Sequence, residues 1–417
     1  MAPIGISGWR CRFGWTGCQG RGILRPTPSV ERKESAVTIT PSTFSAEELL
    51  DEMLKWVQIE SPTYDPAAVN RMLDFVSGRI SALGFKVERI KGTAPKGTQG
   101  LGDILRARTG GDGPGILLIA HADTVHPVGT LAGPLPIKRE GDKCFGPALY
   151  DMKGGTVMAL AAVKAVMAAK LLKLPMTIII NPDEEIGSPS SRAIIEEEAA
   201  KAKYVLVPEP AKGPTGEVTT GRHAFQRFFL TTHGRPAHSG WTNKDGRSAV
   251  RVMAQLIEEL ESQSDFDNGP TYAVSVVHGG QWVNCVPMTC TAQALCVARD
   301  MDTFHKIGRT LDGLVGVRSD VRIEIERGPV RPLWTAHAGT MDLYTRAKRI
   351  AADIGFDLPH GQHGGGSDGN FTGALGKPTL DGLGIMGGGA HTHGEHVLVS
   401  SIVPRTTLMA RLMAELA

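Results

Sequence analysis

Apolar and polar positions alternate in a way that predicts a series of helices and strands from residue 44 onward. The first helix is expected at 44–58, where Ser45 followed by Glu48 forms a capping box ahead of apolar positions at helical spacing. Further helices are expected at 66–83, 153–172 and 191–202, and strands at 85–90, 103–109, 115–125, 175–185 and 204–210. Buried strands that alternate with helices are typical of an α/β sandwich with at least partly parallel strands.

The pattern changes after Pro210, where the sequence GPTG (213–216) is typical of a linker. The next elements follow the order strand, helix, strand, strand, helix, strand, at 223–234, 247–262, 271–280, 291–300, 303–314 and 321–327. This order is the signature of a split βαβ, ferredoxin-like domain. A helix at 339–354 and a strand at 377–383 then resume the α/β pattern. The expected ranges are 44–213 and 330–417 for a two-part α/β domain and 214–329 for an inserted α+β domain.

Composition narrows the possible partners and compartments. The chain has 417 residues, of which 41% are hydrophobic, so it can build two cores. The formal net charge is only +2 and no basic stripe is present, so we expect no nucleic-acid partner. No apolar run reaches the roughly 18 residues that a membrane span requires. Six cysteines without a CxxC pair predict reduced thiols and a cytoplasmic protein.

Residues 1–43 differ from the rest of the chain. This segment carries five arginines that come before or directly beside its first acidic residue, Glu31. It lacks the continuous apolar core of a secretory signal. A transit-like segment is one interpretation, and a disordered leader or an upstream-extended start is the one we favour. We therefore expect it to lie outside the fold.

Polar side chains with metal-binding chemistry recur where predicted strands end. These residues are His121, Asp123, Asp151, Glu184, Glu185, Glu209 and His391. Each one alone has an ordinary explanation as a helix cap, a turn residue or a surface side chain. Ligand sites in open α/β sheets lie beyond the carboxyl ends of the strands, so these side chains can converge there. Two imidazoles and several carboxylates are ligands that two borderline divalent ions require.

Seven motifs in order carry a resemblance to a known family. They are HADTVHPVGT, GPALYDMKGG, PDEEIGS, VPEP, GRPAHSG, GGGSDGN and GGGAHTHGEHV. Together they resemble the zinc-dependent aminoacylase and carboxypeptidase superfamily of metallopeptidases, most closely carboxypeptidase G (glutamate carboxypeptidase). Acetylornithine deacetylase and succinyl-diaminopimelate desuccinylase are relatives within it. The resemblance covers about residues 45–417, and it implies a co-catalytic zinc-peptidase α/β sandwich with an inserted dimerisation, or lid, domain.

The resemblance also implies a role for each strand-end residue. The implied ligands are His121, Asp151 and Glu209 for one zinc ion and Asp151, Glu185 and His391 for the other, with Asp151 as the bridge. Asp123 would orient the His121 ring as an outer-shell carboxylate. Glu184 would act as the general base on a water that the two metals activate. His393 is an alternative to His391, and cobalt or manganese is an alternative to zinc.

Three further motifs concern the substrate. By resemblance, His238 reaches the active site of the partner subunit of a homodimer and stabilises the oxyanion, and Asn284 joins it. Arg331 resembles the arginine that grips the substrate's free α-carboxylate. The glycine-rich loop at 363–370, with Gly366 and Ser367, is expected to let backbone amides approach the same carboxylate. Hinges near Gly213 and Gly328 would permit closure of the inserted domain.

The sequence therefore predicts a di-zinc hydrolase that cleaves an amide bond and releases a C-terminal amino acid, with glutamate favoured by resemblance. An N-acyl amino acid deacylase or desuccinylase is the alternative within enzymes. A catalytically silent amino-acid-binding homologue is the alternative from another class. The intact set of Glu184, the metal ligands and His238 argues against a silent protein.

Overall fold

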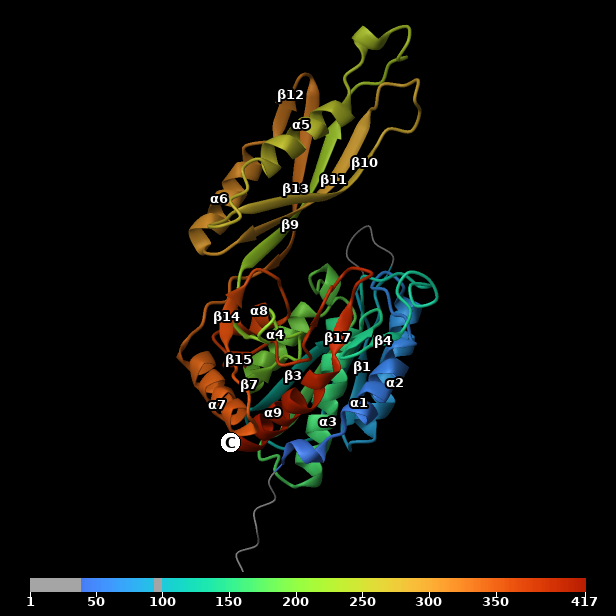
Figure 1. Ribbon diagram of the computed structural model, residues 1–417. Coiled ribbons are helices and arrows are strands. Elements are labelled where there is room, and N and C mark those ends of the chain that lie inside the picture. The colour runs from blue at the N-terminus through green and yellow to red at the C-terminus, as the bar shows by residue number, and fades with distance from the viewer. Residues whose placement is uncertain (1–38, 94–99) are drawn as a thin grey trace, which may run out of the picture. The chain divides into compact units, whose positions relative to one another are not determined.

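A six-stranded sheet with helices on both faces carries the candidate site (Figure 1). The computed structural model describes residues 39–93 and 100–417. The strand order is β1-β2-β6-β3-β7-β15. The strands are β1 (Lys86–Ile90), β2 (Ile104–Arg108), β3 (Gly115–His121), β6 (Met176–Asn181), β7 (Ala202–Leu206) and β15 (Thr379–Leu380). Because β6, β3, β7 and β15 pair in parallel while β1 and β2 are antiparallel, the predicted α/β class with partly parallel strands is confirmed.

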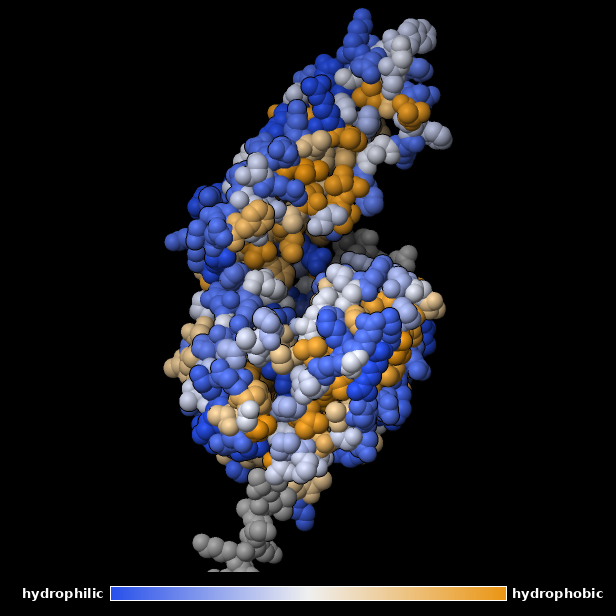
Figure 2. Space-filling view, in the orientation of Figure 1, coloured by the Kyte–Doolittle hydropathy of each residue, from blue (hydrophilic) through white to orange (hydrophobic). Residues whose placement is uncertain are grey.

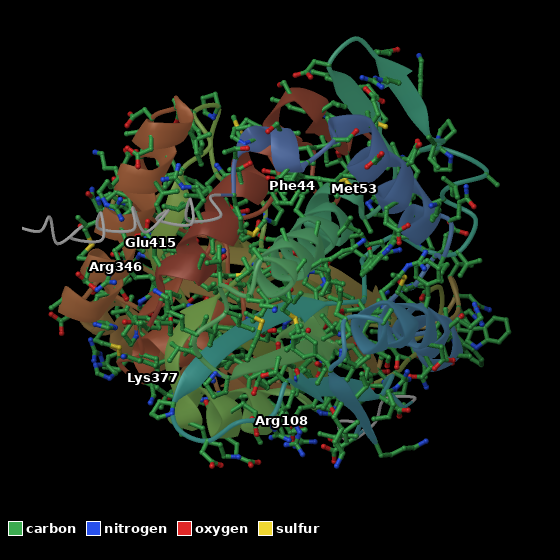
Figure 3. All side chains as sticks on the ribbon, turned by 90° about the horizontal axis from the view of Figure 1, so that it is seen from below. Phe44, Met53, Arg108, Arg346, Lys377 and Glu415 are labelled. Atoms are coloured by element: carbon green, nitrogen blue, oxygen red, sulfur yellow. The ribbon has the colours of Figure 1, made fainter. Side chains whose placement is uncertain are left out.

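Both faces of β3 are buried, which explains its continuous apolar sequence. Ile116 and Leu118 belong to the core beneath the first set of helices, and Leu117 and Ile119 belong to a second core against α4 and α8. The first set comprises α1 (Ala46–Val57), α2 (Pro66–Ser81), α3 (Gly154–Ala168), α7 (Ala338–Ile354) and α9 (Ile402–Glu415), and the second comprises α4 (Arg192–Lys201) and α8 (Gly369–Ala374). Figure 3 shows Met53 on the side of α1 and α3, with Arg108 on the other side of the sheet.

The helix starts agree with the capping signals in the sequence. The Ser45 hydroxyl accepts a hydrogen bond from the Glu48 amide at 3.3 Å, so α1 begins where the capping box predicts. The leader residues 1–38 lie outside the described residues. Ile39, however, is buried in the first core and Pro41–Thr43 forms a short turn, η1, so the described fold begins before residue 44.

Short strands that the periodicity did not predict hold the loops around the site. A four-stranded sheet has the order β16 (Gly387–Gly388), β17 (His396–Leu398), β5 (Lys143–Phe145) and β4 (Lys138–Glu140). Strand β8 (Val218–Arg222) pairs in parallel with β14 (His360–His363). Residues 218–222 fall in the range 214–329 expected for the inserted domain, but the partner of β8 lies in the C-terminal part of the chain and Val218 is in the first core.

A separate five-stranded antiparallel sheet begins at Ala224. Its order is β10 (Thr271–Gly279), β11 (Thr289–Ala298), β9 (Ala224–His233), β13 (Val321–Arg331) and β12 (Gly316–Arg318), and its helices are α5 (Ala249–Glu261) and α6 (Met301–Asp312). Both helices pack on one face and close a core of their own. Apart from the short β12, the elements follow the predicted split βαβ order. The lid and dimerisation roles of this unit stay predictions.

Hydrophobic side chains are also exposed on this second unit, as the orange surface in Figure 2 indicates. Phe266 is 78% exposed and Val277 is 47% exposed. In the described part of the chain, no helix combines the length and the apolar character needed to cross a membrane.

The described cysteines, Cys144, Cys285, Cys290 and Cys296, are free thiols, and Cys11 and Cys18 lie outside the described residues.

Candidate metal centre

The predicted ligands come together at the carboxyl ends of β6, β3 and β7. His121 is the last residue of β3, and Glu209 follows β7. Glu185 lies in the short turn η3 (Glu184–Ile186) just after β6. Asp151 lies in the irregular turn η2 (Leu149–Lys153), and His391 lies in the loop between β16 and β17. Because the three strands are parallel neighbours, their last residues meet at one edge of the sheet.

Asp151 faces two different groups of ligands with its two oxygens. Its Oδ1 lies 3.3 Å from His121 Nε2, which is also 3.7 Å from Glu209 Oε1. Its Oδ2 lies 3.4 Å from His391 Nε2, which is also 3.1 Å from Glu185 Oε2. The arrangement therefore consists of two ligand groups that share one carboxylate.

These separations fit two bound ions. Zinc–ligand distances of about 2.0–2.2 Å in tetrahedral geometry place two ligand atoms roughly 3.3–3.6 Å apart. The 3.3 and 3.4 Å separations from Asp151 match this spacing, whereas the 3.1 Å between His391 Nε2 and Glu185 Oε2 is that of a direct hydrogen bond, which a bound ion would replace. In addition, Glu185 Oε1 is buried without a hydrogen-bond partner among the described residues. Donor atoms of His121, Asp151 and Glu185 all lie within 4.8 Å of one another. The residues thus suit a pair of borderline divalent cations.

Asp123 links the first ligand to the loop that carries the two glutamates. His121 Nδ1 lies 3.0 Å from the Asp123 backbone carbonyl and 3.4 Å from its carboxylate, so Nδ1 carries the hydrogen and Nε2 is free to bind a metal. The Asp123 carboxylate accepts hydrogen bonds from the amides of Glu184 and Glu185 at 3.2 and 3.3 Å, and from the Thr63 hydroxyl at 2.8 Å. The predicted orienting residue therefore acts on the ring chiefly through its backbone carbonyl.

The electrostatics of the cluster suit a cation. Burial raises the pKa of Glu185 to about 7 and raises the pKa of Glu209 well above its ordinary value. Burial lowers the pKa of His121, but its hydrogen bonds to Asp123 and Asp151 outweigh this and the net shift is upward. Hydrogen bonds to Asp151 and Glu185 raise the pKa of His391 to about 11. These shifts reflect a buried group of carboxylates whose mutual repulsion an added positive charge would relieve.

The backbone of His391 has a φ of 64°, in the left-handed region that costs a non-glycine residue about 1 kcal/mol or more. The surrounding loop therefore holds this residue in a strained conformation. The alternative ligand, His393, is exposed, and it forms no ion pair with the cluster in the described part of the chain. The geometry favours His391 over His393.

Glu184 lies beside the cluster and is held by Arg331. Arg331 Nη2 donates to Glu184 Oε1 at 2.7 Å and to the Glu184 carbonyl at 2.8 Å. Its Nη1 donates to Asp368 at 2.8 Å, and Asp368 also accepts from Ser188. Burial raises the pKa of Glu184, and the Arg331 guanidinium opposes that shift. Glu184 is therefore a buried carboxylate that is fixed from one side.

The structure does not present three of the predicted substrate groups to a ligand. Arg331 is only 2% exposed and is already paired with two carboxylates of the protein. Ser367 is buried, its amide donates to Asn370 at 3.0 Å, and its hydroxyl donates to Asp381 at 2.5 Å. A Cβ on Gly366 would lie 2.0 Å from the Phe225 ring, so this glycine serves close packing. Sequence patterns do not reveal such long-range pairings.

His238 and Asn284 lie together on loops of the second unit. The Ser239 amide donates to the Asn284 carbonyl at 3.0 Å, and both His238 and Asn284 are exposed. Within residues 39–93 and 100–417, no hydrogen bond or ion pair joins either side chain to the metal ligands. Neither residue completes the site of its own chain here.

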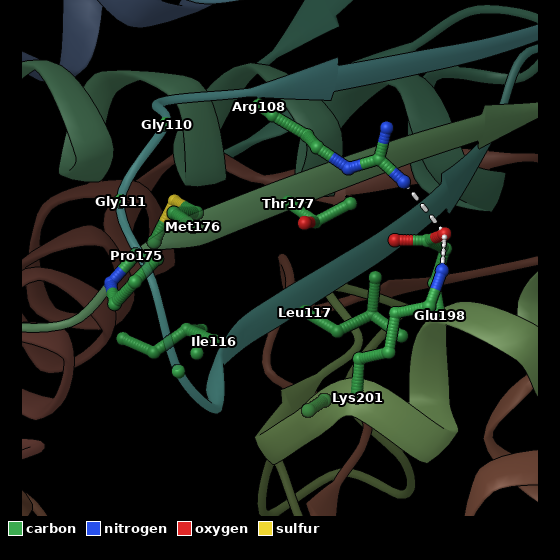
Figure 4. A pocket seen from close by; sticks show the side chains of 13 residues that line it. Arg108, Gly110, Gly111, Ile116, Leu117, Pro175, Met176, Thr177, Glu198 and Lys201 are labelled. Carbon is green, nitrogen blue, oxygen red and sulfur yellow. Dashed lines mark hydrogen bonds and ion pairs between the residues drawn. The ribbon is translucent and has the colours of Figure 1, made fainter.

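A cavity elsewhere in the protein is a useful contrast. It measures about 170 Å³ and lies at the other end of β3, beside Gly115 and Leu117 (Figure 4). Glu198 at its wall is buried and forms ion pairs with Arg108 at 2.7 Å and Lys201 at 3.0 Å. Because Arg108 and Lys201 neutralise the Glu198 carboxylate, this cavity lacks the unpaired negative charge that would attract a cation, unlike the candidate metal centre at His121.

The chain is similar in sequence and fold to known peptidases. The sequence profile of "Peptidase family M20/M25/M40" matches residues 117–415. Carboxypeptidase G2 of Pseudomonas sp. (strain RS-16) is 29% identical over 397 residues, which cover 93% of this chain and 94% of that protein. Acetylornithine deacetylase of Myxococcus xanthus is 25% identical over 233 residues, covering 52% of this chain and 59% of that protein. The M20 family metallo-carboxypeptidase Sso-CP2 of Sulfolobus solfataricus has the same fold, with a TM-score of 0.68, 16% identity, and coverage of 88% of this chain and 98% of that one.

Proposed function

This chain belongs to peptidase family M20/M25/M40, and from that premise we propose that it is a carboxypeptidase that releases a C-terminal amino acid, glutamate in the first instance. The resemblance that the motifs indicated is confirmed at the level of the family, whose members are metal-dependent hydrolases, and the chain is an enzyme of this kind. The observation that carries the proposal is the bridging position of Asp151 between His121 and His391.

We assign the five ligands His121, Asp151, Glu185, Glu209 and His391 to two ions, with zinc as the expected metal and cobalt or manganese as substitutes. When bound, such ions lower the pKa of a water molecule and polarise the carbonyl of the scissile amide. The residues of the chain then place the remaining groups around that carbonyl.

Glu184 is the proposed general base and acid. Its carboxylate lies beside the ligands but belongs to neither ligand group, and because Arg331 engages Oε1, the other oxygen, Oε2, is the one that would take the proton of the attacking water. The same proton then passes from Glu184 to the nitrogen of the leaving amino acid as the C–N bond breaks. Arg331 holds the Glu184 carboxylate in place, and Asp368 holds Arg331. The proposal thus gives Arg331 a positioning role, whereas the sequence pattern predicted contact with substrate.

We further propose that the site is completed in a homodimer. His238 and Asn284 would come from the partner subunit and donate hydrogen bonds to the oxyanion. Their exposure supports this assignment. The unit that begins at Ala224 would be the inserted domain between the two parts of the catalytic domain. The cytoplasmic location stays a prediction.

The alternative is an N-acyl amino acid deacylase, because acetylornithine deacetylase also matches the chain, although over a shorter range. Both reactions would use the same metal ligands and the same base, and they differ only in the acyl group. The other alternative from the sequence, a silent amino-acid-binding protein, is not supported, because the chain belongs to a family of hydrolases and keeps Glu184 and the ligand set.

The test is to incubate the purified protein with zinc and a panel of amides and to measure the free amino acid released. The panel holds N-acyl and N-aminoacyl amino acids, folate-type pteroyl-glutamates, acetylornithine and succinyl-diaminopimelate. If the wild type releases glutamate and Glu184→Gln does not, the carboxypeptidase proposal is supported. Release only from acetyl or succinyl substrates would favour the deacylase, and no release with two metals bound would contradict both.

A further inference from the structure

Glu395 is a buried carboxylate that contacts the turn of the bridging ligand. It lies four residues after His391 and is only 1% exposed. Its Oε1 accepts hydrogen bonds from the amides of Tyr150 and Asp151 at 2.9 and 3.0 Å. Its Oε2 accepts from the Ala148 amide at 3.2 Å and lies 2.6 Å from His126 Nε2. Four donors from two segments therefore converge on one side chain.

The turn that carries Asp151 needs such an acceptor. Ala148 has a φ of 57°, and Asp151 has a φ of −118° and a ψ of 96°, so this segment departs from helical geometry just before α3. The first amides of a helix have no partner within the helix, and successive amides in an irregular turn form a concave anion site. A buried amide without a partner costs about 1–3 kcal/mol, so the shape of this turn depends on the anion that fills it.

Glu395 also connects the two ligand groups. Its backbone belongs to the loop of His391, and its side chain binds the amide of Asp151. The relative position of these two ligands, whose nearest atoms lie 3.4 Å apart, is therefore set partly by one carboxylate that is not itself a ligand.

We propose that Glu395 is the positioning residue of the metal centre: it fixes the bridging carboxylate Asp151 against His391 and so sets the affinity for the pair of ions. This inference rests on the proposed metal-dependent function. A residue of this kind acts through the ligands, and its loss typically lowers metal affinity about 10–100-fold. The glutamine isostere cannot replace it, because its NH₂ group would face one of the amide donors now bound by an oxygen.

The matched control is Glu198, a second buried glutamate that accepts several N–H groups but lies at the other end of β3 (Figure 4). Wild type, Glu395→Gln, Glu395→Asp and Glu198→Gln would be stripped of metal and titrated with Zn²⁺ against a fluorescent chelator. Urea unfolding of the same metal-free samples would give the stability of each protein.

For Glu395→Gln we expect zinc affinity to fall about 10–100-fold in protein that is folded by circular dichroism, with a partial return in Glu395→Asp, which keeps the charge. Glu198→Gln should lose stability and keep wild-type zinc affinity. If Glu395→Gln binds zinc like the wild type and only loses stability, as Glu198→Gln does, the proposal is overturned. If Glu395→Gln does not fold, Glu395→Asp with wild-type zinc affinity overturns it. Because the readout is metal affinity, the result stands even if no substrate of the panel is hydrolysed and the proposed function fails.

Discussion

Arg331 donates a hydrogen bond from Nη2 to Glu184 Oε1 at 2.7 Å, deep in the site. The same guanidinium binds Asp368 at 2.8 Å through Nη1, so a chain of three charged groups ends on the proposed base. Two roles for this arginine can be separated by experiment. One is the binding of the substrate carboxylate, which the sequence motif predicted, and the other is the positioning of Glu184, which the contacts support.

If Arg331 positions the base, Arg331→Gln should lower kcat about 10²-fold, because a displacement of a catalytic group by about 1 Å costs that much. KM should change little, and bound zinc should stay at two ions per chain. A large rise in KM with little change in kcat would instead favour the carboxylate-binding role. Arg327→Gln is the control, since Arg327 lies on the same strand but forms only an exposed ion pair with Asp312.

The adjacent glutamates should respond differently to the same substitution. Glu184→Gln removes the group that carries the proton, so kcat should fall about 10²–10⁴-fold while both metals remain bound. Glu185→Gln removes a carboxylate that lies 3.1 Å from His391, so metal should be lost. Metal analysis and turnover would be measured on the same preparations. Equal loss of metal in both variants would contradict the division of roles.

The choice between the two loop histidines can be tested directly. His391→Ala should reduce the metal content to about one ion per chain, because it removes a ligand on the Glu185 side of the bridge. His393→Ala is the matched control, two residues away on the same exposed loop, and should keep both ions. The opposite pattern in metal analysis would transfer the ligand role to His393.

The ligands could be predicted from the sequence because each one is tied to the end of a strand or to a glycine-rich loop. His121 follows a continuous apolar run, and strands buried on both faces leave few places where such a run can end. Parallel pairing of β3 with β6 and β7 then brings His121, Glu185 and Glu209 to one edge. Local pattern and topology thus indicated these candidates, and the family resemblance gave each of them the role of a ligand.

The supporting contacts could not be predicted in the same way. The guanidinium of Arg331 could bind a substrate or a protein carboxylate, and only the long-range contact with the 363–370 loop decides that Asp368 is its partner. Ser367 likewise reads as an open glycine-loop residue, but Asp381 takes its hydroxyl. The sequence likewise gives no sign that Glu395 accepts hydrogen bonds from the Tyr150 and Asp151 amides. No periodicity in the sequence encodes pairings between segments more than ten residues apart.

Alkaline pH should destabilise the protein through Cys296. Burial raises the pKa of this thiol to about 12, above its ordinary value near 9. Because the folded-state pKa is the higher one, the stabilisation is complete below pH 9 and is lost as the pH rises from 9 toward 12. Between pH 8 and pH 10 the free energy of unfolding in urea should fall by about 1 kcal/mol more for the wild type than for Cys296→Ala. Cys285→Ala, at a half-buried thiol, is the control and should follow the wild type.

Because His238 is exposed, its proposed role in the partner's site can be tested by combining two inactive variants in one dimer. If His238 acts on the site of the partner, a dimer of one His238→Ala chain and one Glu184→Gln chain contains one site with both groups intact. Heterodimers isolated with two affinity tags should then recover about half of the wild-type activity, whereas each homodimer stays inactive.

If both groups instead belong to the same chain, neither site of the heterodimer is complete, and its activity should not exceed that of the homodimers. The metal content must be two ions per chain in all three samples, because neither substitution removes a ligand. Recovery of activity in the heterodimer would support a His238 that acts across the dimer, and a fully active monomer would rule that arrangement out.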